Sequence, residues 1–221
     1  MRKLTCAFCI SFFVLLSPLA YSEASILWEL EKENSDINLA VYTREVPGSD
    51  LKAFKGEILV NANLSTVVAM LLDTKATTEW LYQCEVFELI ESTDAQNVII
   101  YLTNTAPWPV SDRDLIMSSS MVQDPETLIV HTDIKAMKGY WPESDDYVRI
   151  PEMVGSWDFI PKGESQVLIR YQVHADPGGM LPTWLANSVV VDAPFHTLSN
   201  ISEMLKREKY QTAEVSFITN K

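Results

Sequence analysis

The sequence predicts an α+β fold, in which one large curved antiparallel sheet is followed by a long C-terminal helix. Three observations support this fold class. Short apolar segments typical of strands recur about every ten residues, and turn-forming residues separate them. The segment Asp176-Pro177-Gly178-Gly179, which favours a turn, closes this region. The stretch 181–210 then contains no glycine and places apolar side chains near one helical face.

The N-terminal residues have the pattern of a secretory signal peptide. The positively charged Arg2 and Lys3 precede about sixteen mostly apolar residues, and small residues follow. The alternative is a retained membrane anchor, but the apolar stretch is short for a span of roughly 20 residues. We therefore expect residues 1–22 to be removed, by cleavage after Ser22 or Ala24, and the protein to be periplasmic or secreted.

The cysteine content agrees with export, and the negative charge argues against binding to nucleic acid or anionic lipid surfaces. Cys6 and Cys9 lie within the expected signal peptide, so Cys84 alone would remain and no internal disulfide could form. The chain carries a net charge of −13, and residues 1–22 hold two positive charges and no acidic residue, which leaves −15 for the remainder. Such a protein is repelled by nucleic acid and by anionic lipid surfaces, so we expect no nucleic-acid partner.

The first elements after the signal peptide are two strands and two helices. Alternating apolar residues predict strands over Ile37–Val46 and Leu51–Val60, joined by a hairpin with a longer loop. Asn63 or Ser65 can cap a buried helix that runs through Leu72. A second short helix is expected over Thr74–Leu81, and strands then follow over Cys84–Glu91, Gln96–Asn104, Asp114–Gln123, Thr127–Met137, Val148–Ile150, Met153–Ile160 and Gln166–His174.

The last helix is expected to close the fold. Leu185, Val189, Leu198, Ile201 and Leu205 fall near one helical face, and Pro194 should kink the helix. A single helix across a curved sheet need not fill the space beneath it, so an apolar ligand could lie there.

Three blocks of sequence follow one another along the chain. They are the segment 107–114 (PWPVSDRD), the residues 148–150 (VRI) with 155–157 (GSW), and the segment 176–187 (DPGGMLPTWLAN). The first resembles a signature of the START domain family, whose name refers to lipid transfer related to steroidogenic acute regulatory protein, and the other two resemble later blocks of that family in the same order. The resemblance covers about residues 25–210, with 211–221 left as a C-terminal tail.

This resemblance implies a helix-grip (Bet v1-like) fold, in which the curved sheet wraps around the C-terminal helix and encloses a hydrophobic tunnel. It implies binding of one sterol, phospholipid, fatty-acyl or other apolar molecule, for transport or sensing, and no enzymatic activity. We expect a monomer that holds no cofactor or metal. Its partner is expected to be a hydrophobic lipid, and transient contact with a membrane is compatible with this role.

Arg113 is the first candidate for a ligand contact. An arginine that opens an apolar strand can point into a cavity and bind a hydroxyl, carboxylate or phosphate group. The resemblance implies an acidic partner about nineteen positions upstream, which falls on Asp94. The alternative is that Arg113 pairs with Asp112, Asp114 or Asp94 and only fixes the loop.

Aromatic and apolar residues near the last helix supply the other candidates. Trp184, Leu185 and Val189 begin the helix that would close the tunnel, so we expect them to contact a ligand. Trp108 lies between two prolines that stiffen its loop, and we expect it to pack that loop onto the sheet.

Motifs of catalysis are absent from the sequence. The three histidines have no HExxH spacing, Cys84 has no metal-binding partner in sequence, and no nucleophile elbow or dinucleotide-binding loop occurs. Two alternatives to a lipid carrier remain. One is a cyclase- or aromatase-like enzyme that works by shaping a pocket, and the other is an interaction module whose cavity is filled by side chains.

Overall fold

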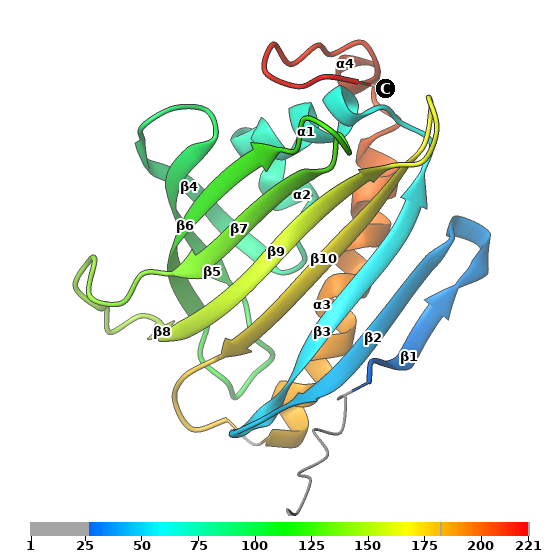
Figure 1. Cartoon of the computed structure of the whole chain (residues 1–221). Helices are drawn as coiled ribbons and strands as arrows, with labels where there is room; N and C mark the ends of the chain where they lie inside the picture. Colours follow the sequence, from blue (N-terminus) through cyan, green and yellow to red (C-terminus); the bar gives the residue numbers. More distant parts are fainter. Residues whose placement is uncertain (1–26, 182, 221) are drawn as a thin grey trace, which may run out of the picture.

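One curved sheet and one long helix form the framework of the protein. The computed structural model describes residues 27–181 and 183–220, so the expected signal peptide, 1–22, lies outside the described residues. Within them, ten strands form a single sheet, and α3 (Thr183–Met204) lies along one of its faces (Figure 1). This arrangement confirms the helix-grip fold. The strands are β1 (Glu29–Asn34), β2 (Leu39–Val46), β3 (Ser49–Val60), β4 (Cys84–Ser92), β5 (Asn97–Asn104), β6 (Arg113–Gln123), β7 (Val130–Ala136), β8 (Val148–Arg149), β9 (Glu152–Pro161) and β10 (Val167–Asp176).

The strand order places the third strand beside the last one in the interior of the sheet. The order is β1-β2-β3-β10-β9-β7-β6-β5-β4, so β3 pairs with β10 although more than 100 residues separate them. All neighbours along this path are antiparallel, as expected. The short β8 is an exception, because it pairs with β6 in parallel.

The N-terminal hairpin is tighter than the sequence predicts. Val46 pairs with Ser49, so only Pro47 and Gly48 form the turn, and the longer loop was a wrong expectation. Gly48 has φ of 81°, a value that glycine adopts without steric cost. Strand β1 was not predicted, because its sequence ELEKEN is largely polar and it forms the edge of the sheet.

Shorter helices cover the end of the sheet opposite the β2–β3 turn (Figure 1). They are α1 (Leu64–Leu72), α2 (Thr77–Trp80) and α4 (Glu208–Gln211). Asn63 is the residue that caps α1, since its side chain accepts a hydrogen bond from the Thr66 N–H. The segment after α4 folds back onto the domain, where Asn220 accepts a bond from the Ser65 N–H and Thr219 bonds Gln123.

Helix α3 lies closest to the sheet at Gly56 of β3. A Cβ atom added to Gly56 would lie 2.5 Å from Leu198 Cδ1 and 3.2 Å from Pro194 Cβ, so glycine permits this contact. Pro194 stands inside the helix, and the kink expected there stays a prediction. The helix ends at Met204, whereas the stretch without glycine continues to Tyr210. None of the described helices is long and apolar enough to cross a membrane.

The two faces of the sheet differ because side chains alternate along each strand. Along β10, Val167, Ile169 and Val173 are buried on the concave face, whereas Arg170 on the outer face pairs with Glu57 of β3 at 2.7 Å. The largest fully buried side chains of the core are Phe159, Leu39, Ile58, Leu64, Met70, Ile116, Ile169, Leu198, Ile201, Val41, Val67 and Val68.

Candidate ligand cavity

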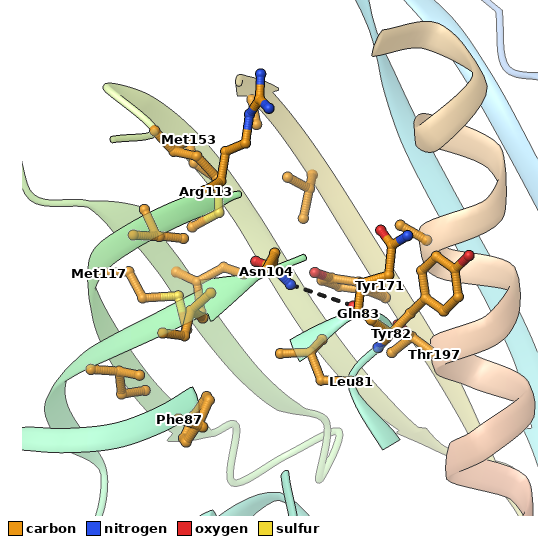
Figure 2. Close-up of a pocket in the computed structure, with 18 of the residues that line it drawn as sticks. Leu81, Tyr82, Gln83, Phe87, Asn104, Arg113, Met117, Met153, Tyr171 and Thr197 are labelled. Atoms are coloured by element: carbon orange, nitrogen blue, oxygen red, sulfur yellow. Dashed lines mark hydrogen bonds between the residues drawn. The ribbon is translucent and has the colours of Figure 1, made fainter. Parts of the chain in front are cut away.

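A cavity of about 490 Å³ lies between the concave face of the sheet and α3. Its size falls within the roughly 300–1,000 Å³ of small-molecule sites. Figure 2 shows Tyr171, Asn104 and Arg113 around this space, with α3 along one side. Most of its lining is apolar and comes from α1, α3 and seven strands, β3 to β7, β9 and β10. The apolar residues include Phe54, Leu72, Phe87, Val98, Ile100, Leu102, Leu115, Met117, Met121, Ile134, Met153, Val173, Leu181, Val190 and Ala193.

Three aromatic residues form the middle of the cavity wall. Trp157 of β9 and Tyr171 of β10 are direct cross-strand partners, and their rings stack with centroids 3.7 Å apart. Trp80, at the end of α2, meets Trp157 edge-on at 6.1 Å. These rings supply a large apolar surface, and the edge-on contact between Trp80 and Trp157 is a geometry that aromatic pairs favour.

Arg113 lines the cavity, and it is the partner of Asn104 across β5 and β6. Its side chain is 8% exposed and donates a hydrogen bond to the Ser111 carbonyl oxygen. Burial lowers the pKa of Arg113, partly offset by the nearby charge of Asp112, yet arginine remains charged at any physiological pH. Within the described chain it makes no ion pair with a carboxylate, so its guanidinium can bind a ligand.

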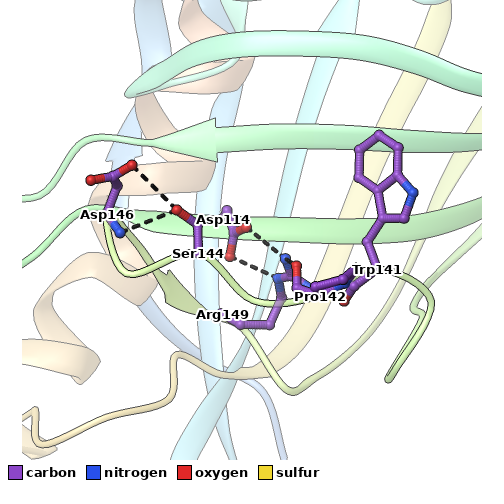
Figure 3. Close-up of polar contacts among 6 residues, drawn as sticks. All are labelled: Asp114, Trp141, Pro142, Ser144, Asp146 and Arg149. Carbon is purple, nitrogen blue, oxygen red and sulfur yellow. Dashed lines mark hydrogen bonds and ion pairs between the residues drawn. The ribbon is translucent and has the colours of Figure 1, made fainter.

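The neighbouring Asp114 instead pairs with Arg149 of β8. Two hydrogen bonds join them, from Arg149 Nε at 2.7 Å and from Nη2 at 2.8 Å, and Asp114 is 2% exposed (Figure 3). The hydrogen bonds and charge of Asp114 raise the pKa of Arg149. Arg149 also donates to the carbonyl oxygens of Trp141 and Pro142, so the pair anchors the loop before β8.

Asp94 lies far from Arg113, and the expected pairing is wrong. Arg113 pairs with Asn104 at one end of the β5–β6 ladder, whereas Asp94 precedes Asn97 at the other end, about 24 Å away at ~3.4 Å per residue. The exposed Asp94 carboxylate accepts bonds from Asn97 and Gln96, and these bonds lower its pKa. It therefore fixes the β4–β5 turn and does not line the cavity.

The start of α3 lines the cavity at two of the three positions where we expect ligand contact, and the contact itself stays a prediction. Leu185 and Val189 both line the cavity. Trp184 belongs to the first turn of α3, and its side chain lies outside the described part of the structure.

Exposed apolar side chains surround the outer end of the cavity near Arg113. A second hollow of about 560 Å³ shares Pro107, Val110, Arg113 and Leu185 with the cavity and adds Trp108 and Met180. Trp108 is 92% exposed, so the expectation that it packs its loop onto the sheet is wrong. The prolines stiffen the loop, but sequence could not tell toward which side the ring points.

Groups suited to acid–base or metal chemistry are scarce in the cavity. Of the side chains that line it, Lys52, Tyr82, Arg113 and Tyr171 can ionise, and none of these is a carboxylate, histidine or cysteine. The described residues contain no group of three or more potential metal ligands. Cys84 is buried outside this lining, and burial raises the pKa of its thiol to about 11, which disfavours the thiolate at neutral pH.

Comparisons with known proteins agree with this architecture. A family model described as START domain matches residues 19–209. An uncharacterised protein of Pseudomonas aeruginosa is 35% identical over 175 residues, covering 79% of this chain and 84% of that protein. The crystal structure of a STAR-related lipid transfer protein fragment from Xanthomonas axonopodis has a TM-score of 0.74 at 36% identity, covering 81% of this chain and 99% of that one. Human StAR-related lipid transfer protein 5 has a TM-score of 0.69 at 16% identity, covering 81% and 86% of the two chains, and supports the fold alone.

Proposed function

We propose that this protein, which belongs to the START domain family, binds one hydrophobic lipid in its cavity and carries it through an aqueous compartment. Membership of the family implies a hydrophobic ligand, while the carrier role is the proposal. The observation that supports it most directly is the cavity of about 490 Å³ between the sheet and α3, with a mostly apolar lining.

The energetics suit a lipid with a long apolar part. Each CH₂ group moved from water into the cavity contributes about 0.8 kcal/mol, so an acyl chain gains affinity without polar contacts. The few polar groups then determine which lipid is preferred. Arg113 is placed to bind a polar or anionic head group at the outer end of the cavity.

Lipid exchange would require contact with a membrane, and the outer end of the cavity offers a surface for it. Trp108 and Met180 are fully or almost fully exposed beside the cavity, and tryptophan favours the interface between lipid and water. The net charge of −13 opposes binding to anionic surfaces. We therefore infer that the surface formed by Trp108 and Met180 docks through apolar contacts onto bilayers of low negative charge.

Export forms part of the same proposal and rests on the sequence of residues 1–22. N-terminal sequencing of the protein from its own host would test it. A mature protein that begins at Glu23 or Ser25 would support export, whereas a chain that retains residues 1–22 in the cytoplasm would contradict it.

The carrier role is tested by native mass spectrometry of the protein purified from its host, followed by lipid extraction. A bound lipid released by denaturation is the expected result and would name the ligand class. Repeated absence of any apolar ligand, together with failure to bind added fatty acids, alcohols and phospholipids, would overturn the proposal.

The two alternatives are less well supported. An interaction module with a filled core conflicts with the cavity volume. An enzyme of this fold would need titratable groups that converge in the cavity, and its lining contains no carboxylate or histidine among the described side chains. A lipid recovered unchanged after incubation with the protein is the outcome that separates a carrier from an enzyme.

A further inference from the structure

The cavity follows β6 along most of the strand. Every second residue from Arg113 to Met121 lines it, with Leu115, Met117 and Ser119 between them. Met121 comes eight residues after Arg113, so the lining covers about 27 Å of strand at ~3.4 Å per residue. An extended alkyl chain advances about 1.25 Å per carbon, given bond lengths of about 1.5 Å and angles of about 111°. A lipid whose head group binds Arg113 can therefore lay a long chain along β6.

The wall of the cavity is exposed to solvent near the turn between β4 and β5. Leu89 of β4 lines the cavity and is 47% exposed. Ser92 and Ala95, which follow it along the chain, also line the cavity and are exposed. By contrast, Met153 of β9 and Val173 of β10 line the cavity with only 8% exposure each. Several side chains in one segment that border both the cavity and solvent indicate that the cavity opens to the surface there.

The strand register places this exposed segment away from Arg113. Ser92 pairs with Val98 of β5, which pairs in turn with Ser119 of β6. Ser119 comes six residues after Arg113, which corresponds to about 20 Å of strand at ~3.4 Å per residue. Figure 2 shows Phe87, also of β4, on the side of the cavity away from Arg113. About 16 carbons of an extended chain cover this distance at ~1.25 Å per carbon.

The charged side chains of the lining lie away from this exposed segment. Among the described residues that line the cavity, only Lys52 and Arg113 carry a charge at neutral pH. Lys52 belongs to β3, which five strands separate from β4, and its ammonium group lies 3.5 Å from the Glu31 carboxylate. Arg113 makes no ion pair within the described chain. A polar or anionic head group is therefore favoured at Arg113, and the apolar chain is favoured toward Leu89.

We propose that the cavity has a second opening, lined by Leu89, Ser92 and Ala95, through which the methyl end of a long-chain lipid leaves the protein. This inference rests on the proposed function and names its ligand class as a lipid whose chain has about 16 carbons or more. CH₂ groups inside the cavity each strengthen binding, whereas those beyond the opening remain in water and add little. A chain that is too long for the cavity should therefore still bind.

The test uses palmitate with the bulky fluorophore 9-anthroyloxy on its terminal carbon, 16-(9-anthroyloxy)palmitate, which we call the terminal probe. The fluorophore should lie at or beyond the second opening. The terminal probe should therefore bind the full protein with a dissociation constant within about threefold of that of unlabelled palmitate. Fluorescence titration measures the terminal probe, and isothermal titration calorimetry measures palmitate. Iodide, a water-soluble quencher, should quench the bound fluorophore.

Ala95→Trp is designed to obstruct the second opening. It should weaken binding of the terminal probe roughly tenfold, the effect of moderate overpacking, and leave palmitate affinity within about twofold. Quenching of the bound probe by iodide should also fall. Ser92→Trp repeats the test from β4 if Ala95→Trp fails to fold, as judged by circular dichroism. Ser165→Trp is the matched control, because Ser165 is exposed in the β9–β10 turn and does not line the cavity.

The outcomes separate the second opening from the carrier role. If palmitate binds and the terminal probe does not, the cavity is closed at this end, so the second opening is overturned while lipid binding stands. If iodide quenches the bound probe equally in the unaltered protein and in both tryptophan variants at this site, the chain leaves elsewhere, which also overturns the second opening. Failure of both palmitate and the probe to bind contradicts the carrier role, and the second opening falls with it.

Discussion

Gly56 of β3 lies directly beneath Leu198 of α3, and a Cβ atom at Gly56 would come within 2.5 Å of the leucine Cδ1. Leu198 is completely buried, so its side chain has little room to move aside. The close approach of α3 to β3 at this point depends on this contact. Any side chain at position 56 must push the helix away or distort the leucine.

Gly56→Ala should therefore destabilise the protein by about 1–3 kcal/mol, the usual cost of overpacking a core. Urea denaturation measures the change. The double variant Gly56→Ala with Leu198→Ala tests the cause, because the two changes should be clearly non-additive when they share one contact. Additive losses would show that the clash at Leu198 is not the reason.

Breaking the buried pair between Asp114 and Arg149 should cost far more than breaking a surface pair. We expect Asp114→Ala to lower the free energy of unfolding by about 3–5 kcal/mol, because Arg149 is left buried without its partner. The control is Glu203→Ala, which removes the exposed partner of Lys206 and should cost less than about 1 kcal/mol. Similar losses in both variants, measured in urea, would contradict the anchoring role of Asp114.

Arg113→Leu should weaken binding of anionic lipids without weakening the fold. Loss of a charge-assisted contact corresponds to about 1.5–3 kcal/mol, or at least roughly tenfold in affinity. Dodecanoate is the probe, and dodecane is the control ligand that should bind unchanged. If dodecanoate affinity is the same in both proteins, Arg113 does not contact the head group.

Serine at positions 108 and 180 should reduce membrane association. The exposed Trp108 and Met180 lie beside the outer end of the cavity, so Trp108→Ser/Met180→Ser should lower sedimentation with phosphatidylcholine vesicles at least severalfold. Val122→Ser is the control, since Val122 is exposed at the opposite end of β6. An equal effect of Val122→Ser would argue against a specific docking surface.

His131 should make stability depend on pH. Its Nδ1 lies 2.6 Å from Asp158 and its Nε2 lies 3.2 Å from Asp133. Desolvation is the largest single influence and lowers the pKa of His131, but the hydrogen bonds and charges of the two aspartates outweigh it, so the pKa is raised.

A raised pKa means that the folded protein holds the proton more tightly than the unfolded chain. The stabilisation is thus complete below the unfolded pKa of about 6.5 and is lost as pH rises through the folded pKa. As pH rises from 5.5 to 8.5, the melting temperature should fall by the amount that protonated His131 contributes to stability. His131→Gln should remove this part of the pH dependence. An unchanged pH profile in His131→Gln would contradict the assignment.

The order of elements could be predicted from sequence because local patterns carry that information. Alternation of apolar residues located β2 to β7, β9 and β10, and the two possible caps Asn63 and Ser65 indicated where α1 begins, with Asn63 the one that the structure uses. The pattern failed at β1, whose polar residues occupy a sheet edge and need not alternate. Arg113 was identified as a candidate because it opens an apolar strand, and Leu185 and Val189 because they begin the last helix.

The sequence by itself determined the fold class, the lipid-binding family and the charge of this protein, since these follow from periodicity, motif order and composition. Only the tertiary structure decided that Asp114 pairs with Arg149 and not with Arg113, that Trp108 is exposed, and that Asp94 lies beyond the end of β5 that is far from Arg113. It also placed Trp80, Thr132 and Tyr171 around one cavity wall. These relationships depend on which side chains meet across β6, β7, β9 and β10, and that requires the pairing register of all four strands together, which the pattern of any one strand does not contain.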